Sequence, residues 1–275
     1  MAELKELLTV EELPILGRVL KDVKLPSGLY VSLRETNAED DGVISNYSKL
    51  GDGSAIDEYI SGVTVKGEKS NRLTIEEVRE LKVRDRYYIL LLVRVLSLGN
   101  TLKFIHVCTS EKCQKLKLDN KYTGTEWEED ISVFITNLDN IPPNQEGTSS
   151  LLITPYSNGN NKIIEFTLDN AEGTRLRYKA LTGRLENELA ARGTKDFNQN
   201  SVIFARKLEV FIDNKWVEAN SLKRFSSREA AMIRNHIREN DGEWQPLTNI
   251  VCPNCQTVSQ TPIFGIKDFY FPEEI

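Results

Sequence analysis

The apolar positions of the chain are densest near its middle, between Tyr88 and Leu96. The longest unbroken apolar run is seven residues, Tyr87 to Val93, and an arginine flanks it on each side. A helix that is apolar on nearly every face is buried in a protein interior. The pattern therefore predicts a central buried helix that starts at Asp85 and ends at Gly99-Asn100, because glycine commonly terminates helices.

Other helices are predicted from their starting residues. Two capping boxes, Thr74 to Glu77 and Ser226 to Glu229, place a hydroxyl residue three positions before a glutamate that reaches back to it. The second box opens a helix that should reach about Asn240 and bury one face, which carries Ala230, Ile233 and Ile237. A shorter helix is predicted over 184–191, capped by Thr182.

Alternation of apolar and polar residues, the period of a half-buried strand, predicts the β-structure. The clearest case is a hairpin in which 162–168 and 174–180 alternate around a turn at 169–173. It should place Ile164, Phe166 and Leu168 opposite Leu176, Tyr178 and Ala180. Further strands are predicted at 29–34, 102–107, 131–135 and 262–264.

Charge and hydropathy narrow the class of protein. The 275 residues carry a net charge of −6, with a pI near 5.3, which argues against a general nucleic-acid binder. No apolar run approaches the roughly 20 residues of a membrane-spanning helix. The first residues lack the apolar run and cleavage site of a secretion signal. We therefore expect a soluble protein, without a membrane partner, in a reducing compartment.

The four cysteines form two close-spaced pairs, Cys108 with Cys113 and Cys252 with Cys255. Four thiolates complete the tetrahedral shell of a zinc ion, and one tight turn can supply each pair. In the second pair the proline favours a turn, and Asn254 tolerates an unusual backbone angle. A zinc ion shared by both pairs requires the fold to bring Cys113 and Cys252 together.

Other uses of these cysteines make different demands. Two disulfides would require an oxidising compartment. A redox dithiol at Cys252 and Cys255 would favour a helix N-terminus, whereas strand-like sequences flank this pair. A catalytic zinc leaves one position open to water and usually has His or carboxylate ligands. His106 should face the same side of its strand as Cys108 and could replace a sulfur. We expect a structural Zn²⁺ held by the four cysteines.

Together these elements predict an α+β fold: a central buried helix with β-hairpins and a four-cysteine, zinc-ribbon-like lobe formed by two distant knuckles. Four segments follow from this pattern. Residues 1–35 are an N-terminal arm and strand, and 36–113 are a helical core with the first cysteine pair. Residues 114–180 are β-rich, and 181–275 hold helices and the C-terminal zinc-knuckle lobe. This last segment can form one discontinuous domain with 36–113.

Motifs of enzyme chemistry are missing from the sequence. The glycines do not form a phosphate-binding loop, and Leu181-Thr-Gly183 lacks the flanking glycines of a nucleophile elbow. The 41 carboxylates sit mostly at helix starts or on polar faces, and two histidines leave little material for His-based catalysis. We expect no enzymatic activity and no catalytic residues.

A basic stripe, made of Lys112, Lys115, Lys117 and Lys121, lies beside the first cysteine pair. It is the feature that favours a nucleic-acid role, although Tyr122 is the one aromatic beside it for base stacking. The exposed face of a strand is the simpler interpretation.

Three aromatic residues, Phe269, Tyr270 and Phe271, come shortly before the C-terminal Ile275. They allow two interpretations: an anchor that binds a partner protein, or packing of the cysteine lobe onto the core. The sequence does not separate the two.

The order of these motifs resembles that in a phage family, the baseplate hub subunits or hub-assembly chaperones of T-even-type contractile tails. The resemblance covers Asp85 to Cys113, Arg177 to Gly183, Ser226 to Gly242 and Val251 to Pro272. Its most distinctive part is Cys-Pro-Asn-Cys followed by the Asp-Phe-Tyr-Phe-Pro ending. The first 70 residues carry no match, and 137–161 looks like an insertion.

This resemblance implies a non-enzymatic structural or assembly protein with a structural zinc, located in the virion tail baseplate or in the host cytoplasm during assembly. Its partners would be baseplate hub or wedge proteins and other copies of itself. The alternative is a zinc-ribbon module that binds nucleic acid or a polymerase, with salt-sensitive binding through Lys112 to Lys121. The acidic net charge counts against it. A zinc enzyme would need an open coordination position, which four cysteines do not leave.

Overall fold

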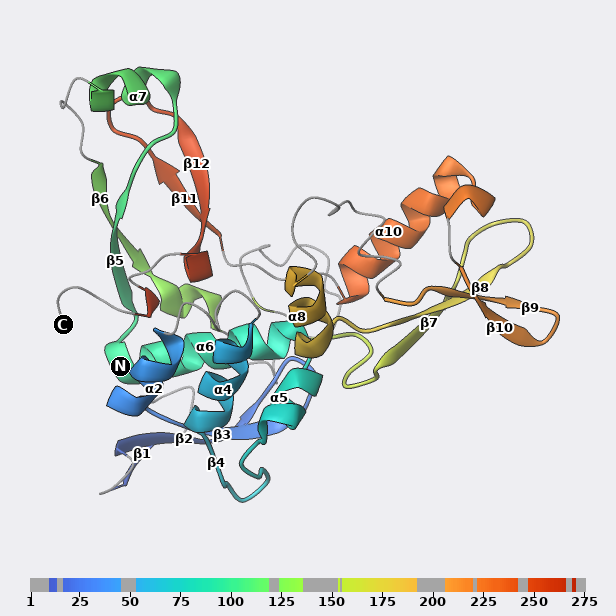
Figure 1. Ribbon diagram of the computed structural model, residues 1–275, viewed down its shortest axis with the longest axis horizontal. Helices are drawn as coiled ribbons and strands as arrows, with labels where there is room; N and C mark the ends of the chain where they lie inside the picture. The colour runs from blue at the N-terminus through green and yellow to red at the C-terminus, as the bar shows by residue number, and fades with distance from the viewer. Residues whose placement is uncertain are drawn as a thin grey trace.

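The computed structural model describes residues 10–13, 17–45, 53–118, 124–135, 153, 155–191, 206–219, 222–241, 247–265 and 269–270. It confirms the α+β class, with 39% of these residues in helices and 30% in strands. Figure 1 shows three parts: a body, a cysteine lobe that projects from it, and a hairpin lobe at the far end of the long axis. Within the described ranges, none of the helices has the length and apolar character needed to cross a bilayer.

The body surrounds one buried helix. Its strands are β1 (Val10–Leu13), β2 (Gly17–Lys24), β3 (Tyr30–Arg34) and β4 (Thr64–Val65), which form an antiparallel sheet in that order. Its helices are α2 (Ala38–Ile44), α4 (Ser54–Val63), α5 (Ile75–Glu80), α6 (Val83–Leu98) and α8 (Gly183–Ala191), with the 3-10 turn η1 (Ile131–Phe134). Helix α6 packs on β2, β3 and α4, so the sheet and the other helices enclose it.

The central helix was predicted correctly apart from its start. Helix α6 is buried along most of its length and ends at Gly99, whose φ of 82° suits glycine. It begins at Val83, two residues before the predicted start at Asp85. Asp85 is not a cap, because its carboxylate accepts a hydrogen bond from the backbone N–H of Ser27 at 2.9 Å. Lys82 instead sets the start by forming a β-bridge with Thr182.

A buried ionic network joins four helices of the body. The carboxylate of Asp57 on α4 accepts hydrogen bonds from Arg86 on α6 at 2.7 Å, Arg79 on α5 at 3.0 Å and Asn187 on α8 at 2.9 Å. Asp57 is fully buried and Arg86 is 1% exposed. Helix α8 approaches so closely that a Cβ on Gly183 would lie 1.8 Å from Arg86 Nη1. Buried charges are tolerated only when they are paired in this way.

The capping boxes agree with the sequence pattern, whereas the strand within the N-terminal arm was not predicted. Residues 10–13 of the predicted arm form β1, paired with β2; residues 1–9 and 14–16 lie outside the described residues. The Thr74 hydroxyl accepts from the Glu77 backbone N–H at 3.3 Å, while the Glu77 carboxylate accepts from the Thr74 N–H at 2.8 Å. Ser226 and Glu229 form the same reciprocal pair.

The hairpin lobe contains the predicted hairpin. Its elements are β7 (Ile163–Thr167), β8 (Arg175–Lys179), β9 (Glu209–Ile212), β10 (Lys215–Glu218), η3 (Leu222–Arg224) and α10 (Ser227–Asp241). The register pairs Ile164 with Tyr178 and Phe166 with Leu176, as the alternation predicts. The strands lie in the order β10-β9-β8-β7. Helix α10 covers part of one face and buries Ala230, Ile233 and Ile237 in a second core.

The cysteine lobe is built from two antiparallel hairpins that are distant in sequence. One consists of β5 (Thr101–His106) and β6 (Thr125–Asp130), with α7 (Glu111–Leu118) between them; the other consists of β11 (Leu247–Val251) and β12 (Val258–Pro262), followed by the 3-10 turn η4 (Ile263–Gly265). Figure 1 shows both hairpins rising from the body side by side, with α7 at the tip.

Three strand predictions in this region were wrong. Residues 131–134 of the predicted 131–135 strand form η1, because the Asp130 carboxylate accepts the Ser132 N–H at 2.9 Å and turns the chain. Residues 263–264 belong to η4 rather than to a strand. The stretch that begins with Lys112 is helix α7, not the face of a strand. The predicted loop at 141–150 lies outside the described residues.

Candidate metal centre

Polar contacts hold the two hairpins of the cysteine lobe together below its tip. His106 Nε2 on β5 lies 2.9 Å from Ser259 Oγ on β12. The Thr248 hydroxyl on β11 donates to the carboxylate of Glu129 on β6. These contacts align the two hairpins, so the chain reversals at their ends come together.

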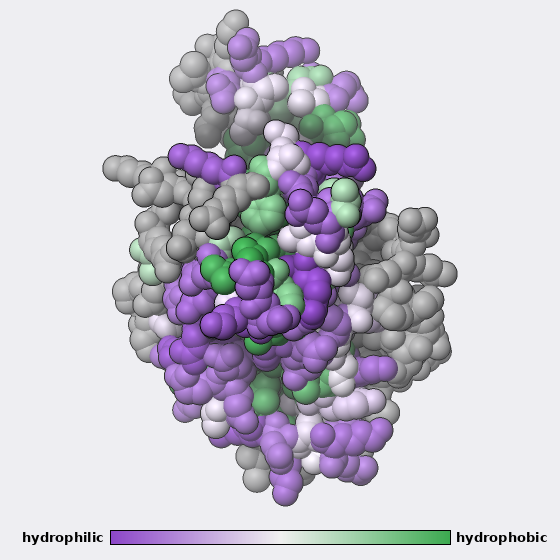
Figure 2. Space-filling model, turned by 90° about the vertical axis from the view of Figure 1, so that its right-hand side faces the viewer, coloured by the Kyte–Doolittle hydropathy of each residue, from purple (hydrophilic) through white to green (hydrophobic). Residues whose placement is uncertain are grey.

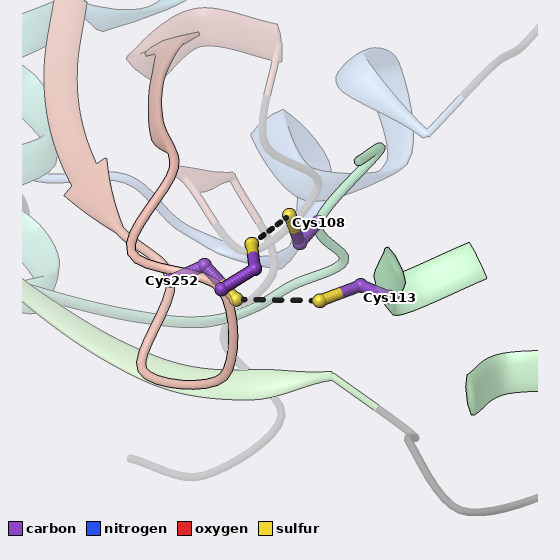
Figure 3. Close-up of side chains that lie close together, drawn as sticks. Cys108, Cys113 and Cys252 are labelled. Carbon is purple, nitrogen blue, oxygen red and sulfur yellow. Dashed lines mark hydrogen bonds between the residues drawn. The ribbon is translucent and has the colours of Figure 1, made fainter. Parts of the chain in front are cut away.

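The four predicted cysteines meet at this tip. Cys108 follows β5 and Cys113 lies in the first turns of α7, while Cys252 and Cys255 flank the turn between β11 and β12. Their ligand atoms all lie within 4.8 Å of one another. Figure 3 shows the labelled side chains of Cys108, Cys113 and Cys252 converging on one point from separate segments. Three of the four are buried, and Cys255 is partly exposed.

The shortest sulfur separations join the two half-sites. Cys108 Sγ lies 3.6 Å from Cys255 Sγ, and Cys113 Sγ lies 3.6 Å from Cys252 Sγ. Zinc–sulfur bonds of about 2.3 Å in a tetrahedron place the sulfurs about 3.8 Å apart, whereas a disulfide holds them at about 2.0 Å. The separations therefore fit four ligands around one metal ion and do not fit disulfides.

Hydroxyl groups inside the two turns contact the sulfurs. The Ser110 hydroxyl donates to Cys255 Sγ at 3.2 Å, and the Ser110 backbone N–H donates to Cys108 Sγ at 3.5 Å. Thr257 Oγ1 lies 3.2 Å from Cys255 Sγ. Sequence reasoning missed Ser110 and Thr257. The available signal was their position, one between the cysteines of the first pair and one just after the second.

These contacts stabilise negative charge at one sulfur and oppose it at another. The Ser110 hydroxyl, together with the side chain and backbone of Thr257, lowers the pKa of Cys255 to about 5. Ser110 also acts to lower the pKa of Cys113, but burial and hydrogen bonds to the other cysteines outweigh it and raise that pKa to about 12. A cation at the centre would favour the thiolate form of Cys113, since metal binding displaces thiol protons.

The second half-site has the predicted position between two strands. Strands β11 and β12 pair directly, with Val251 opposite Val258, so Cys252 precedes a turn rather than a helix, and the placement does not suit a redox dithiol. The unusual backbone angle does not occur at Asn254, where it was predicted. It occurs at Gln256, with a φ of 60°.

His106 does not join the cluster of four cysteines. Its Nε2 contacts Ser259, so its ring connects the two hairpins. Lys112, the described member of the basic stripe, donates to the backbone carbonyl of Asn254 at 3.3 Å. It therefore also connects the two half-sites. The side chains of Lys115 and Lys117 and the whole of Lys121 lie outside the described residues, and the nucleic-acid role stays a prediction.

The C-terminal aromatics pack into the body. Phe269 is 1% exposed, and its ring centroid lies 5.0 Å from that of Phe264 and 4.9 Å from that of Tyr270. Phe264 in turn stacks on Tyr87 of α6 with centroids 4.9 Å apart. Phe269 is therefore packed into the core, as the packing interpretation expects, and partner binding through these aromatics stays a prediction. Phe271 lies outside the described residues.

In comparisons with known proteins, the chain matches no protein-family model, no curated protein and no solved structure. A function is therefore proposed from the cysteine site, from its place in the fold and from the motifs of the sequence.

Proposed function

We propose that this chain is a non-enzymatic structural or assembly protein whose cysteine lobe is held together by a structural zinc ion. The observation that carries the proposal is the convergence of four sulfurs from two distant half-sites. Four thiolates are the ligand set of structural zinc sites and fill the tetrahedral shell, so no position is left for substrate or water. The ion would then stabilise the fold and take no part in catalysis.

The zinc ion would fasten two hairpins that polar contacts, such as those of His106 with Ser259 and of Thr248 with Glu129, already align. A structural zinc supplies about 10–16 kcal/mol of apparent binding energy, which compares with about 5–15 kcal/mol for the stability of a typical domain. Such a contribution is large enough to decide whether this projecting lobe is folded. The lobe would then present a rigid surface to partner proteins.

Apolar side chains on the outside of the lobe support a contact role. Val251 and Val258 pair across β11 and β12, and they are 43% and 60% exposed. Ile105 on β5 is 62% exposed. Single exposed apolar side chains are normal on a protein surface, whereas adjacent ones more often mark an interaction site. The Val251–Val258 pair is adjacent to the metal-binding turn.

We further propose, from the resemblance of the sequence motifs, that the assembly is the baseplate of a T-even-type contractile phage tail. The chain would act there as a hub subunit or as a hub-assembly factor. It would contact hub or wedge proteins and other copies of itself, in the virion or in the host cytoplasm during assembly. The stretches that resemble this family include both halves of the cysteine site.

The test is incorporation of variants into baseplates assembled in cells that lack the wild-type chain. Cys252→Ser combined with Cys255→Ser is expected to abolish incorporation, because the lobe loses two ligands. Ser157→Ala removes a hydroxyl that donates to Asn240 of α10, away from the metal site, and should incorporate normally. Normal baseplates with the double cysteine variant would contradict the proposal. Val258→Lys leaves all four ligands in place and tests whether the lobe surface itself is the contact.

A further inference from the structure

The hairpin lobe contains a groove that is separate from the cysteine site. Its volume is about 720 Å³, within the range of roughly 300–1,000 Å³ that is typical of binding pockets. It lies between the β9–β10 end of the sheet and the start of α10. The apolar residues that line it are Val210, Phe211, Ile212, Val217, Ala219 and Phe225.

The groove exists because α10 covers only part of the sheet. The helix packs Ile233 and Ile237 against the core formed by β7 and β8. On the neighbouring strands, Ile212 remains 44% exposed and Val217 45% exposed. Figure 2 looks onto this end of the molecule and shows hydrophobic surface bordered by hydrophilic surface. The sheet therefore offers an apolar surface that its own helix does not cover.

The carboxylates beside the apolar face of the groove are those of Glu172 and Glu229. Glu218 also lines the groove, but it pairs with Glu209, so alternation along the strand turns its side chain to the other face of the sheet from Val217. Hydrogen bonds from Asn170 and Ser226 lower the pKa of Glu229 and keep it ionised. The one basic lining residue, Arg175, places its guanidinium over the rings of Phe211 and Trp216, at 4.6 and 5.6 Å from their centroids. It also pairs with Glu165 at 3.5 Å. The carboxylates of the groove are therefore not neutralised by Arg175.

An open strand edge lies beside the groove. Strand β10 ends the four-stranded order β10-β9-β8-β7, so one side of its backbone has no strand partner in the part of the chain that the structure describes. Open edges of this kind accept extended peptides, in which backbone pairing gives affinity and side-chain pockets give specificity.

We propose that this groove binds an extended segment of a partner protein in which an apolar side chain is flanked by lysines or arginines. The apolar side chain enters among Ile212, Val217 and Phe225, and the cations face the carboxylates. A nucleic acid would bring phosphates to the same carboxylates and be repelled. The inference does not depend on the zinc site, and it adds a specific contact chemistry to the proposed assembly role.

The test measures peptide binding to the purified full-length chain by fluorescence anisotropy. The first probe is a synthetic peptide with one leucine flanked by lysines, and the second has glutamates in place of the lysines. We expect binding of the lysine peptide only, weakened by added salt because the carboxylates are exposed to solvent. The assay contains no baseplate component, so its result is independent of the phage assignment.

Two matched variants locate the site. Val217→Lys places a cation in the apolar part of the groove and should weaken binding of the lysine peptide by about tenfold or more, as for other buried contact residues. Ile163→Lys changes a residue of the same sheet that is 50% exposed and does not line the groove, and should leave binding unchanged. Thermal unfolding of each variant shows that it is folded.

Several results would overturn the proposal. These are no binding of the lysine peptide, equal binding of both peptides, or unchanged binding by a folded Val217→Lys variant. Sedimentation provides a separate check on the occupant: a wild-type dimer that Val217→Lys dissociates would show that the groove holds a second copy of the chain instead. A monomeric wild type that binds the lysine peptide supports the proposal.

Discussion

Cys113 Sγ lies 3.6 Å from Cys252 Sγ, although 139 positions separate the two residues in the sequence. The contact forms only after β5 and β6 have met β11 and β12 at the tip of the cysteine lobe. The half-sites are not adjacent in an unfolded chain, so metal binding here is coupled to folding. The entropy of closing so long a loop opposes the contact and grows slowly with loop length. A metal ion offsets that cost.

Removal of the metal with a chelator is expected to unfold the cysteine lobe while the hairpin lobe stays folded. Three of the cysteines form a small buried cluster of their own, distinct from the core of the hairpin lobe. Hydrogen exchange is the measurement: chelation should remove protection from β11 and β12 and leave that of β7 and β8 unchanged. Full protection of β11 and β12 without metal would count against the role given to the site.

Replacement of Ser110 by alanine is expected to weaken metal binding without removing a ligand. Its hydroxyl donates to Cys255 and accepts the Cys113 backbone N–H at 3.4 Å, so it orients two ligands. Loss of such supporting contacts typically lowers metal affinity 10–100-fold. Competition with a zinc-chelating dye measures the change, and Ser157→Ala is the matched control. Equal affinities for Ser110→Ala and wild type would show that the hydroxyl is dispensable.

Replacement of Asp57 by alanine is expected to lower the free energy of unfolding by about 3 kcal/mol, because Arg86 would lose its buried partner and keep only the half-buried carboxylate of Glu186, 3.3 Å away. The matched control is Glu165→Ala, which breaks an ion pair with Arg175 in which both side chains are 52% exposed. Exposed pairs contribute about 1 kcal/mol or less. Urea unfolding of the two variants compares them. Similar losses would mean that the buried network is not a main source of stability.

Stability should also depend on pH through Asp85. Burial raises the pKa of Asp85 to about 6 from 3.8, partly opposed by the hydrogen bond from Ser27 and by Lys82 and Lys162. The folded state binds this proton more tightly than the unfolded state, so the contribution of Asp85 to stability is full below pH 3.8 and is lost as the pH rises through about 6. The difference between these two pKa values corresponds to about 3 kcal/mol in the free energy of unfolding.

The variant Asp85→Asn tests this dependence, because the amide oxygen can still accept the Ser27 N–H and carries no charge. It should stabilise the protein by up to about 3 kcal/mol at pH 8 relative to wild type and by little at pH 4. Urea unfolding across this pH range is the measurement. A gain that does not change with pH would mean that ionisation of Asp85 is not the cause.

The elements that the sequence predicted well are those with strong local signals. The capping boxes at Thr74 and Ser226 formed because each hydroxyl and glutamate satisfy one another within one turn. The 163–179 hairpin formed in the predicted register because a slip of one residue would move its apolar side chains to solvent. The second cysteine pair was placed correctly because strand-like residues flank it.

The errors came from short segments in which one side chain changes the course of the backbone. In η1, Asp130 accepts the Ser132 N–H and turns an apolar, strand-like sequence into a 3-10 turn. In α7, the cysteine spacing suggested a turn, but the lysines, glutamine and leucines around Cys113 are good helix formers. The hydrogen bonds that Asp57 accepts from Arg86 and Asn187 were not predictable, because they depend on how α4 packs against α6 and α8.

Native mass spectrometry of the purified chain shows whether the four cysteines share one structural metal ion. We expect one zinc per chain, lost on denaturation, with all four thiols then free to alkylate. We also expect no zinc on the chain that carries Cys252→Ser with Cys255→Ser. A folded wild-type chain that carries no metal, with four free thiols or with disulfides, would contradict a shared metal site.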